Sequence, residues 1–201
     1  KNLNCMNILN KIKLILFNPD KFFSGLKEKT IQDSLLYYII LLAFNVIMGY
    51  LILLIFGDVF IRYLYNLFNL NLALPTLNAI NLFGQVILGY ILAIAFSFLM
   101  VGILYVWLLI FGGNKGYAKT YQLYAYSQTP SLLLKWIPFL SFFIWIYDLV
   151  LLIIGTKKIY NFSTTKAVLI YVIPTIIIFI IVLFVFIGIL AVLRRTNLGV
   201  Y

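Results

Sequence analysis

Long runs of apolar residues that are almost free of charge dominate the pattern along this chain of 201 residues. They cover residues 34–56, 81–111, 137–154 and 167–193. An α-helix needs about twenty apolar residues to cross a hydrocarbon core of roughly 30 Å. Each run therefore predicts a membrane-spanning helix, and the expected fold class is all-α, a polytopic membrane helical bundle.

The segment 117–136 is less apolar, and hydropathy alone does not decide whether it crosses the membrane. Its polar side chains and its interrupting proline are Lys119, Gln122, Ser127, Gln128 and Pro130. Cytoplasmic segments of membrane proteins carry an excess of basic residues. This chain obeys that rule whether or not the segment 117–136 crosses, so the charges do not decide the number of crossings either. Because proline lacks a backbone donor, Pro130, Pro138 and Pro174 are expected to bend or end helices. If the bundle has a groove, we expect it at the bend from Ser127 to Pro130.

The first 33 residues form the most strongly charged region. Apolar residues recur there at helical spacing between Ile8 and Leu16, with Lys11 and Lys13 to one side, which predicts a helix lying among lipid headgroups. Asn18-Pro19-Asp20 then predicts a helix start. In that second helix, Phe22, Phe23 and Leu26 are expected to face lipid, and Lys21, Lys27 and Lys29 to reach anionic headgroups. The alternative is an ordinary solvated basic tail.

The domain boundaries follow from this pattern. Residues 1–16 are expected to be a basic amphipathic interfacial segment, 17–193 a helical membrane domain and 194–201 a short tail. Met6 opens a plausible start, so no function is placed on residues 1–5. The lysines interrupt the apolar patch near the start and no small-residue cleavage site follows, so the first membrane helix is expected to serve as an uncleaved insertion signal.

The first membrane helix is expected to begin at Thr30, which has Asp33 at capping-box spacing, and to end near Phe56. Beyond it, Asp58 and Arg62 are spaced to pair on one helical face, and several asparagines follow. We expect residues 58–74 to form an interfacial helix, although a re-entrant segment stays open.

Small residues recur every four positions in the second long run, at Gly89, Ala93 and Ser97. This spacing allows two helix backbones to approach closely, so these three residues are expected to form a helix-packing stripe.

Composition narrows the class of protein further. Hydrophobic residues make up 65 % of the chain, charged residues 10 %, and the mean hydropathy is +1.10. The net charge of +10 arises from basic residues between the apolar runs, where they fix topology, so nucleic-acid binding is not expected. A lone Cys5 and the absence of histidine make an internal disulfide, a metal site or a cofactor unexpected.

Asp148 is the candidate chemical residue, because an unpaired carboxylate inside an apolar run is costly. It would serve an ion or proton path, or it would be structural, either paired with Lys119, Lys135 or a tyrosine or left neutral through a raised pKa, and we favour the structural interpretation. Tyr117, Tyr121, Tyr124 and Tyr126 are expected at a membrane interface rather than in a site. No nucleophile with a base, no paired carboxylates and no phosphate-binding glycine loop stand out, so an enzyme is not expected.

A set of short motifs suggests a family. They are Phe111-Gly112-Gly113-Asn114-Lys115-Gly116-Tyr117, Tyr124-Ala125-Tyr126-Ser127-Gln128-Thr129-Pro130, Ile137-Pro138, Trp145 and Ile154-Gly155. From about residue 17 to 193 the chain resembles the Yip family, named for membrane proteins that interact with Ypt/Rab small GTPases. The resemblance implies five transmembrane helices, a cytoplasmic amino terminus and an outside or lumenal carboxyl terminus. In eukaryotic members it further implies a role in vesicle traffic, through GTPase binding or membrane shaping.

The acidic, tyrosine-containing DLYGP-type motif of the members that work with Rab proteins does not precede Phe17, so small-GTPase binding is not expected. The chain looks more like the short prokaryotic or archaeal branch. We expect a multi-pass protein of the cell membrane that acts as a scaffold or adaptor, with the lipid bilayer as a partner. The alternative is a small transporter or channel-like subunit with Asp148 in its pathway.

Overall fold

The computed structural model describes residues 7–28, 30–67 and 79–198, and its regular secondary structure there is entirely helical. The helices are α1 (Ile8–Phe17), α2 (Pro19–Ser24), α3 (Gln32–Leu67), α4 (Ala79–Ile110), α5 (Tyr117–Ser127), α6 (Thr129–Leu134), α7 (Ser141–Tyr160) and α8 (Thr164–Leu198). Three stretches of the described chain are long and apolar enough to cross a membrane: Gln32–Gly57, Leu82–Ile110 and Thr164–Ile189. A helical membrane protein is thus confirmed, while the count of five crossings stays a prediction.

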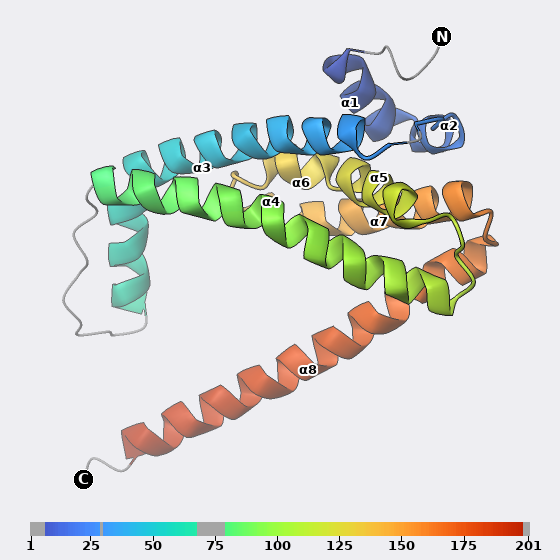
Figure 1. Cartoon of the computed structure of the whole chain (residues 1–201). Helices are drawn as coiled ribbons and strands as arrows, with labels where there is room; N and C mark the ends of the chain where they lie inside the picture. Colours follow the sequence, from blue (N-terminus) through green and yellow to red (C-terminus); the bar gives the residue numbers. More distant parts are fainter. Residues whose placement is uncertain (1–6, 29, 68–78, 199–201) are drawn as a thin grey trace.

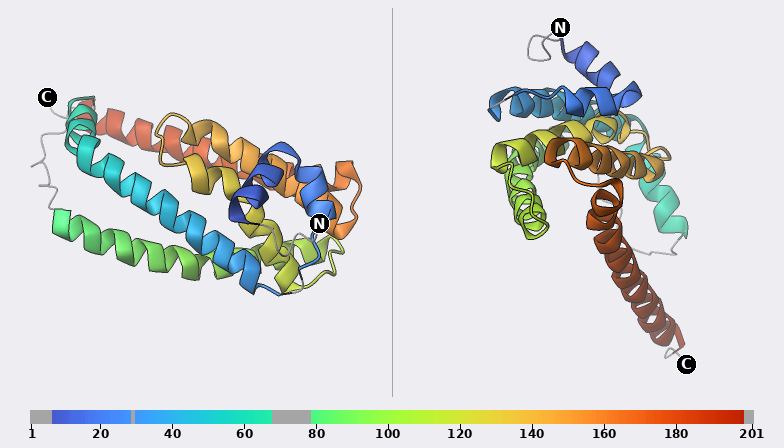
Figure 2. Two further views of the ribbon diagram at one scale, coloured as in Figure 1. Left: turned by 90° about the horizontal axis from the view of Figure 1, so that it is seen from above. Right: turned by 90° about the vertical axis from the view of Figure 1, so that its right-hand side faces the viewer.

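Helices α5 and α6 lie inside the bundle, with α5 packed against α3, α4 and α7 (Figure 1). Helices α1 and α2 cover one side of this body, and α8 leaves it on the other (Figure 2). The indole Nε1 of Trp107 in α4 donates to the carbonyl of Ile170 in α8 at 3.0 Å. Beyond that region the α8 side chains at 176–189 are exposed, as suits a helix surrounded by lipid.

The central position of α5 explains why hydropathy misses it. The side chains at 120–123 and 125–127 are buried, and the polar groups of Thr120, Tyr121, Gln122 and Tyr126 find partners inside the protein. The Thr120 hydroxyl lies 2.7 Å from the Tyr160 hydroxyl, and the Tyr121 hydroxyl lies 3.1 Å from Ser97 Oγ. A helix shielded from lipid by its neighbours does not need an apolar surface.

The helix break at Pro130 is confirmed, since α5 ends at Ser127 and Pro130 lies in the first turn of α6. Ser127, Thr129 and Pro130 are all buried. Neighbouring side chains therefore fill the bend, and it does not form the open groove considered from the sequence.

The amino-terminal helices differ from the sequence expectation. Asn18-Pro19 does begin a helix, although no side-chain capping bond forms at Asn18. Phe22 and Phe23 are buried in the core rather than facing lipid, and Lys11 is buried as well. Tertiary packing overrides the amphipathic pattern here, because α1 and α2 dock onto the bundle with these side chains inward.

Helix α3 begins at Gln32 and extends well past the predicted end at Phe56 (Figure 1). Its continuation to Leu67 means that the first part of the segment 58–74 belongs to this helix, and this last part runs at a steep angle to the rest (Figure 1). A helical glycine such as Gly57 costs only about 1 kcal/mol, which does not stop the helix. Residues 68–74 and the proposed pairing of Asp58 with Arg62 lie outside the described part of the chain.

Helix α7 also differs at both ends from the apolar run 137–154 that predicted it. It begins at Ser141, three residues after Pro138, whose carbonyl accepts a hydrogen bond from Ser141 Oγ at 2.6 Å. It continues through Gly155 to Tyr160, and the next residue, Asn161, adopts the left-handed conformation with φ of 56°. Gly155 is therefore an internal helix residue rather than a terminal one.

Two glycines shape the turn between α4 and α5. Gly112 has φ of +82°, which favours glycine, and Gly113 is buried. A Cβ on Gly113 would lie 2.9 Å from the Leu108 carbonyl oxygen and from Tyr160 Cδ1. The turn is thus packed closely against the end of α7.

The three residues of the small-residue stripe on α4 differ in how closely other helices pack against them. Ser97 is buried at the Tyr121 hydroxyl, and Ala93 is partly buried against the core. Gly89 is exposed, and no other part of the described chain comes within 4 Å of the position of a Cβ there. Close packing within this chain therefore concerns the Ser97 end of the stripe.

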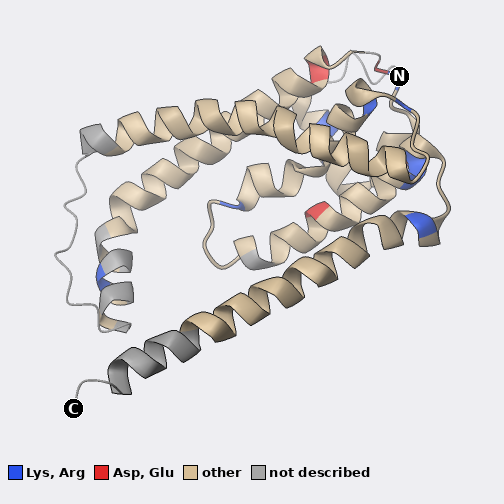
Figure 3. Ribbon diagram, turned by 60° about the horizontal axis from the view of Figure 1, so that its bottom comes forward, with Lys and Arg blue, Asp and Glu red and all other residues tan. Residues whose placement is uncertain are grey.

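Basic residues gather at one end of the molecule, where α1 and α2 lie and α8 begins (Figure 3). At this end α3 begins, α4 ends, α5 begins and α7 ends. Charges from segments far apart in the sequence thus share one face.

Candidate functional site

Glu28, between α2 and α3, is the most deeply buried acidic residue in the described chain, with 1 % of its surface exposed. Its Oε1 lies 2.8 Å from Lys11 Nζ, and the Tyr126 hydroxyl donates to Oε2 at 2.7 Å. A buried charge is tolerated only when it is paired and hydrogen-bonded, as this carboxylate is.

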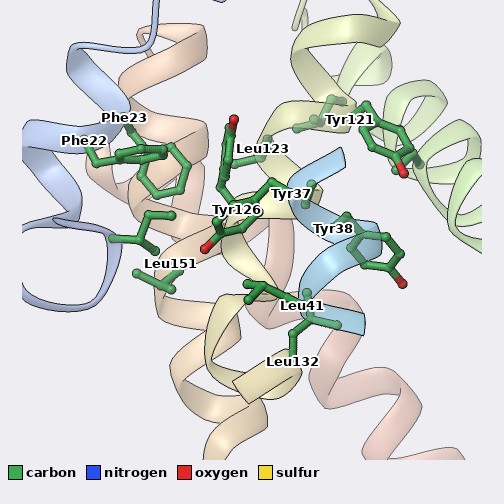
Figure 4. Packing of buried hydrophobic residues seen from close by; sticks show 14 of the residues in the cluster. Phe22, Phe23, Tyr37, Tyr38, Leu41, Tyr121, Leu123, Tyr126, Leu132 and Leu151 are labelled. Carbon is green, nitrogen blue, oxygen red and sulfur yellow. The ribbon is translucent and has the colours of Figure 1, made fainter. Parts of the chain in front are cut away.

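Tyr126 joins the ion pair to the aromatic core. The Lys11 ammonium lies 5.5 Å from the centre of the Tyr126 ring. The ring packs edge-on against Phe22 of α2 at 4.9 Å and against Tyr37 of α3 at 5.0 Å (Figure 4). The Tyr126 ring thus links the ion pair to α2 and α3.

Two further side chains of α5 hold the backbone around Glu28. Lys119 donates to the carbonyls of Glu28 and Leu26, and to Gln122 Oε1 at 3.0 Å. Gln122 Nε2 donates to the Thr30 carbonyl at 2.7 Å. We name Lys11, Glu28, Lys119, Gln122 and Tyr126 the amino-terminal clamp.

Contacts with α7 complete the attachment of α1 and α2. The Tyr147 hydroxyl donates to the carbonyl of Leu16, and Lys158 Nζ lies 2.9 Å from Asp20 Oδ1. Phe23 packs over Gly155, where a Cβ would lie 3.0 Å from Phe23 Cε1 and would collide with Leu123 Cδ1. Glycine at this position therefore lets α2 and α5 approach α7.

Asp148 in α7 is buried and has partners other than the predicted ones. The backbone N–H of Ser131 donates to Oδ1 at 3.2 Å, and Ser131 Oγ donates to Oδ2. Of the predicted partners, Lys135 acts on the carboxylate electrostatically without forming an ion pair, and the hydrogen bonds come from Ser131 in α6 instead. The carboxylate fastens α7 to α6 just after the buried bend.

The tyrosines of α5 pack against neighbouring helices. Tyr121 and Tyr126 are fully buried, Tyr117 donates to the Phe98 carbonyl at 2.8 Å, and Tyr124 packs near Tyr38. They connect α5 to α3 and α4. Their position at the depth of a membrane interface stays a prediction, because burial against neighbouring helices does not set their depth.

The structure brings together only some of the candidate residues that the sequence singled out. Ser127, Pro130 and Asp148 lie along the α5, α6 and α7 contact, and the Ser127 hydroxyl is buried without a partner among the described residues. Pro138 is in the α6 to α7 connection, while Gly112 and Gly113 form the α4 to α5 turn.

Sequence reasoning does not single out Glu28, because it stands between Lys27 and Lys29 and has the appearance of a solvated charged linker. A usable signal is that acids are scarce in a chain with only five of them. In the part of the chain that the structure describes, no three His, Cys, Asp or Glu side chains lie together as a metal site would need. The amino-terminal clamp and the contact of Asp148 with Ser131 therefore hold helices in place through an ion pair and hydrogen bonds.

A helical bundle with apolar spanning helices and an interior held by paired polar groups defines an integral membrane protein. The model of the Yip1 domain matches residues 13–187, from within α1 to within α8. The chain belongs to the Yip family. Searches among curated proteins and among solved structures found no similar protein.

Proposed function

We propose that the protein is a non-enzymatic scaffold or adaptor of the Yip type within the membrane. The observation that carries this proposal is that the two buried carboxylates of the described chain are held by other groups of the protein. Glu28 is held by Lys11 and Tyr126, and Asp148 by Ser131. Such groups fix a shape, as a platform for partners requires.

We also propose five crossings. Helix α4 ends and α8 begins at the same end of the molecule, so α5, α6 and α7 form a hairpin that leaves this end and returns to it (Figure 1). Helix α7 has 20 residues, which at about 1.5 Å each is close to the hydrocarbon thickness of roughly 30 Å. This length supports a hairpin that crosses completely.

The distribution of basic residues supports a cytoplasmic amino terminus. The basic end in Figure 3 is the one at which α3 and α8 begin. Cytoplasmic segments of membrane proteins carry an excess of Lys and Arg. The carboxyl terminus then lies on the opposite side.

The transporter alternative depends on Asp148, and its contacts support the structural role. In a scaffold, Asp148→Asn keeps most hydrogen bonds to Ser131, whereas Asp148→Leu leaves the Ser131 groups unsatisfied. We expect the Asn variant to melt close to wild type in detergent and the Leu variant to lose about 1–3 kcal/mol of stability.

The decisive experiment measures both the binding of partner proteins and the flux of ions. Tagged wild type and Asp148→Asn are purified from native membranes and their bound proteins are quantified, while the pure proteins are tested for proton and cation flux in liposomes. The scaffold proposal expects the same specific partners for both proteins and flux no greater than in empty liposomes. A wild-type flux that disappears in a well-folded Asn variant would establish the transporter instead.

A further inference from the structure

Lysines from four separate segments surround the end of the molecule at which the apolar spans meet their connections. Lys21 lies in α2, Lys27 between α2 and α3, Lys115 between α4 and α5, and Lys166 in the first turn of α8. All four are exposed. We name this group the basic rim; Figure 3 shows the basic residues gathered at this end.

The acidic residues nearby leave the rim largely uncompensated. Asp20 pairs with Lys158, and Glu28 is buried with Lys11, so these two acids are already neutralised. Asp33, at the start of α3, is exposed. Among the described residues, no ion pair involves a lysine of the rim. The surface therefore has an excess of positive charge.

The position of the rim indicates what would bind it. The apolar span Gln32–Gly57 begins shortly after Lys27, Leu82–Ile110 ends shortly before Lys115, and Thr164–Ile189 contains Lys166 near its start. Residues that flank the ends of membrane spans lie at the depth of the lipid headgroups. Clustered lysines at this depth attract anionic phospholipids.

We infer that Lys21, Lys27, Lys115 and Lys166 together form a binding surface for the phosphate groups of anionic phospholipids. The folded bundle assembles this surface, because its lysines are up to 145 positions apart in the chain. Lys11 and Lys119 do not contribute to it, since the amino-terminal clamp uses their charges. The inference depends on membrane insertion and not on the scaffold role.

Native mass spectrometry of the full chain in neutral detergent tests the inference, with phosphatidylglycerol and phosphatidylcholine as probes. We expect wild type to bind phosphatidylglycerol preferentially, and added salt to weaken this preference. Replacing all four rim lysines by Gln should weaken phosphatidylglycerol binding by about tenfold or more. Because the protein is purified, any change in its direction of insertion does not affect the result.

The matched control is Arg62→Gln with Lys135→Gln, which removes two exposed basic residues away from the rim. This double variant should retain phosphatidylglycerol binding, and melting curves verify that every variant is folded. Equal binding of both lipids by wild type would overturn the inference, as would an equal loss in the control. Displacement of the lipid by inorganic phosphate at equal concentration would identify a free-anion site and would also overturn it.

Discussion

Lys11 and Glu28 show how individual charges are accommodated inside this bundle. Each is 6 % exposed or less, and the Tyr126 hydroxyl binds the same carboxylate. Desolvation makes such a pair a weak source of net stability, but removing one partner leaves an unpaired buried charge. The pair therefore determines how α1 docks.

At the residue scale, we predict that Glu28→Ala lowers the free energy of unfolding by about 3–5 kcal/mol, because Lys11 loses its partner. Adding Lys11→Met should recover part of this loss. The measurement is unfolding of the purified protein in detergent by heat and by denaturant. Lys13→Met is the control, since Lys13 lies two residues further along the same helix and is exposed, and this variant should leave stability unchanged. If Lys13→Met changed the stability of the Glu28→Ala variant as much as Lys11→Met does, Lys11 would not be the partner of Glu28.

The elements of this bundle depend on a few close approaches between helices. Helices α2 and α5 approach α7 at Gly155, and α5 reaches α4 through Tyr121 and Ser97. Helix α5 has a polar composition that is stable in a membrane protein only because its neighbours cover it. Its place in the bundle thus depends on the fit of the surrounding helices.

At the element scale, we predict that Gly155→Ala destabilises the protein by about 1–3 kcal/mol, because the new methyl group would collide with Leu123 and Phe23. Detergent melting curves measure the effect. Gly102→Ala is the matched control, since Gly102 lies inside α4 and has open space at the corresponding position. It should be neutral or stabilising by up to about 1 kcal/mol. A loss at Gly102 as large as that at Gly155 would refute close packing at α7.

The topology of the whole molecule depends on the hairpin of α5, α6 and α7. If the hairpin crosses completely the chain crosses five times, and if it is re-entrant the chain crosses three times. Both numbers are odd, so the two termini lie on opposite sides in either case. The connection between α6 and α7 is the region that distinguishes them.

At the scale of the whole molecule, we predict that this connection reaches the outside. In a Cys5→Ser background, Phe139→Cys should react with a membrane-impermeant maleimide on intact cells, because Phe139 is 89 % exposed in that connection. Lys115→Cys should react only after the cells are opened. A Phe139→Cys variant that reacts from neither side would indicate a re-entrant hairpin.

The sequence by itself determined the class of protein, because apolar runs of membrane-spanning length do not depend on their neighbours. It also determined the break at Pro130 and the helix start at Pro19, since proline acts locally on the backbone. The family followed from short motifs around Gly112, Ser127 and Gly155.

Only the tertiary structure decided which polar side chains face inward. Lys11 and Glu28 are 17 residues apart, and Asp148 binds Ser131 across two helices, so no local pattern reveals either contact. Phe22 and Phe23 suit lipid and protein interior equally well, because both are apolar. Their burial against Gly155 and Tyr126 depends on where the other helices pack, and helical periodicity describes each helix alone.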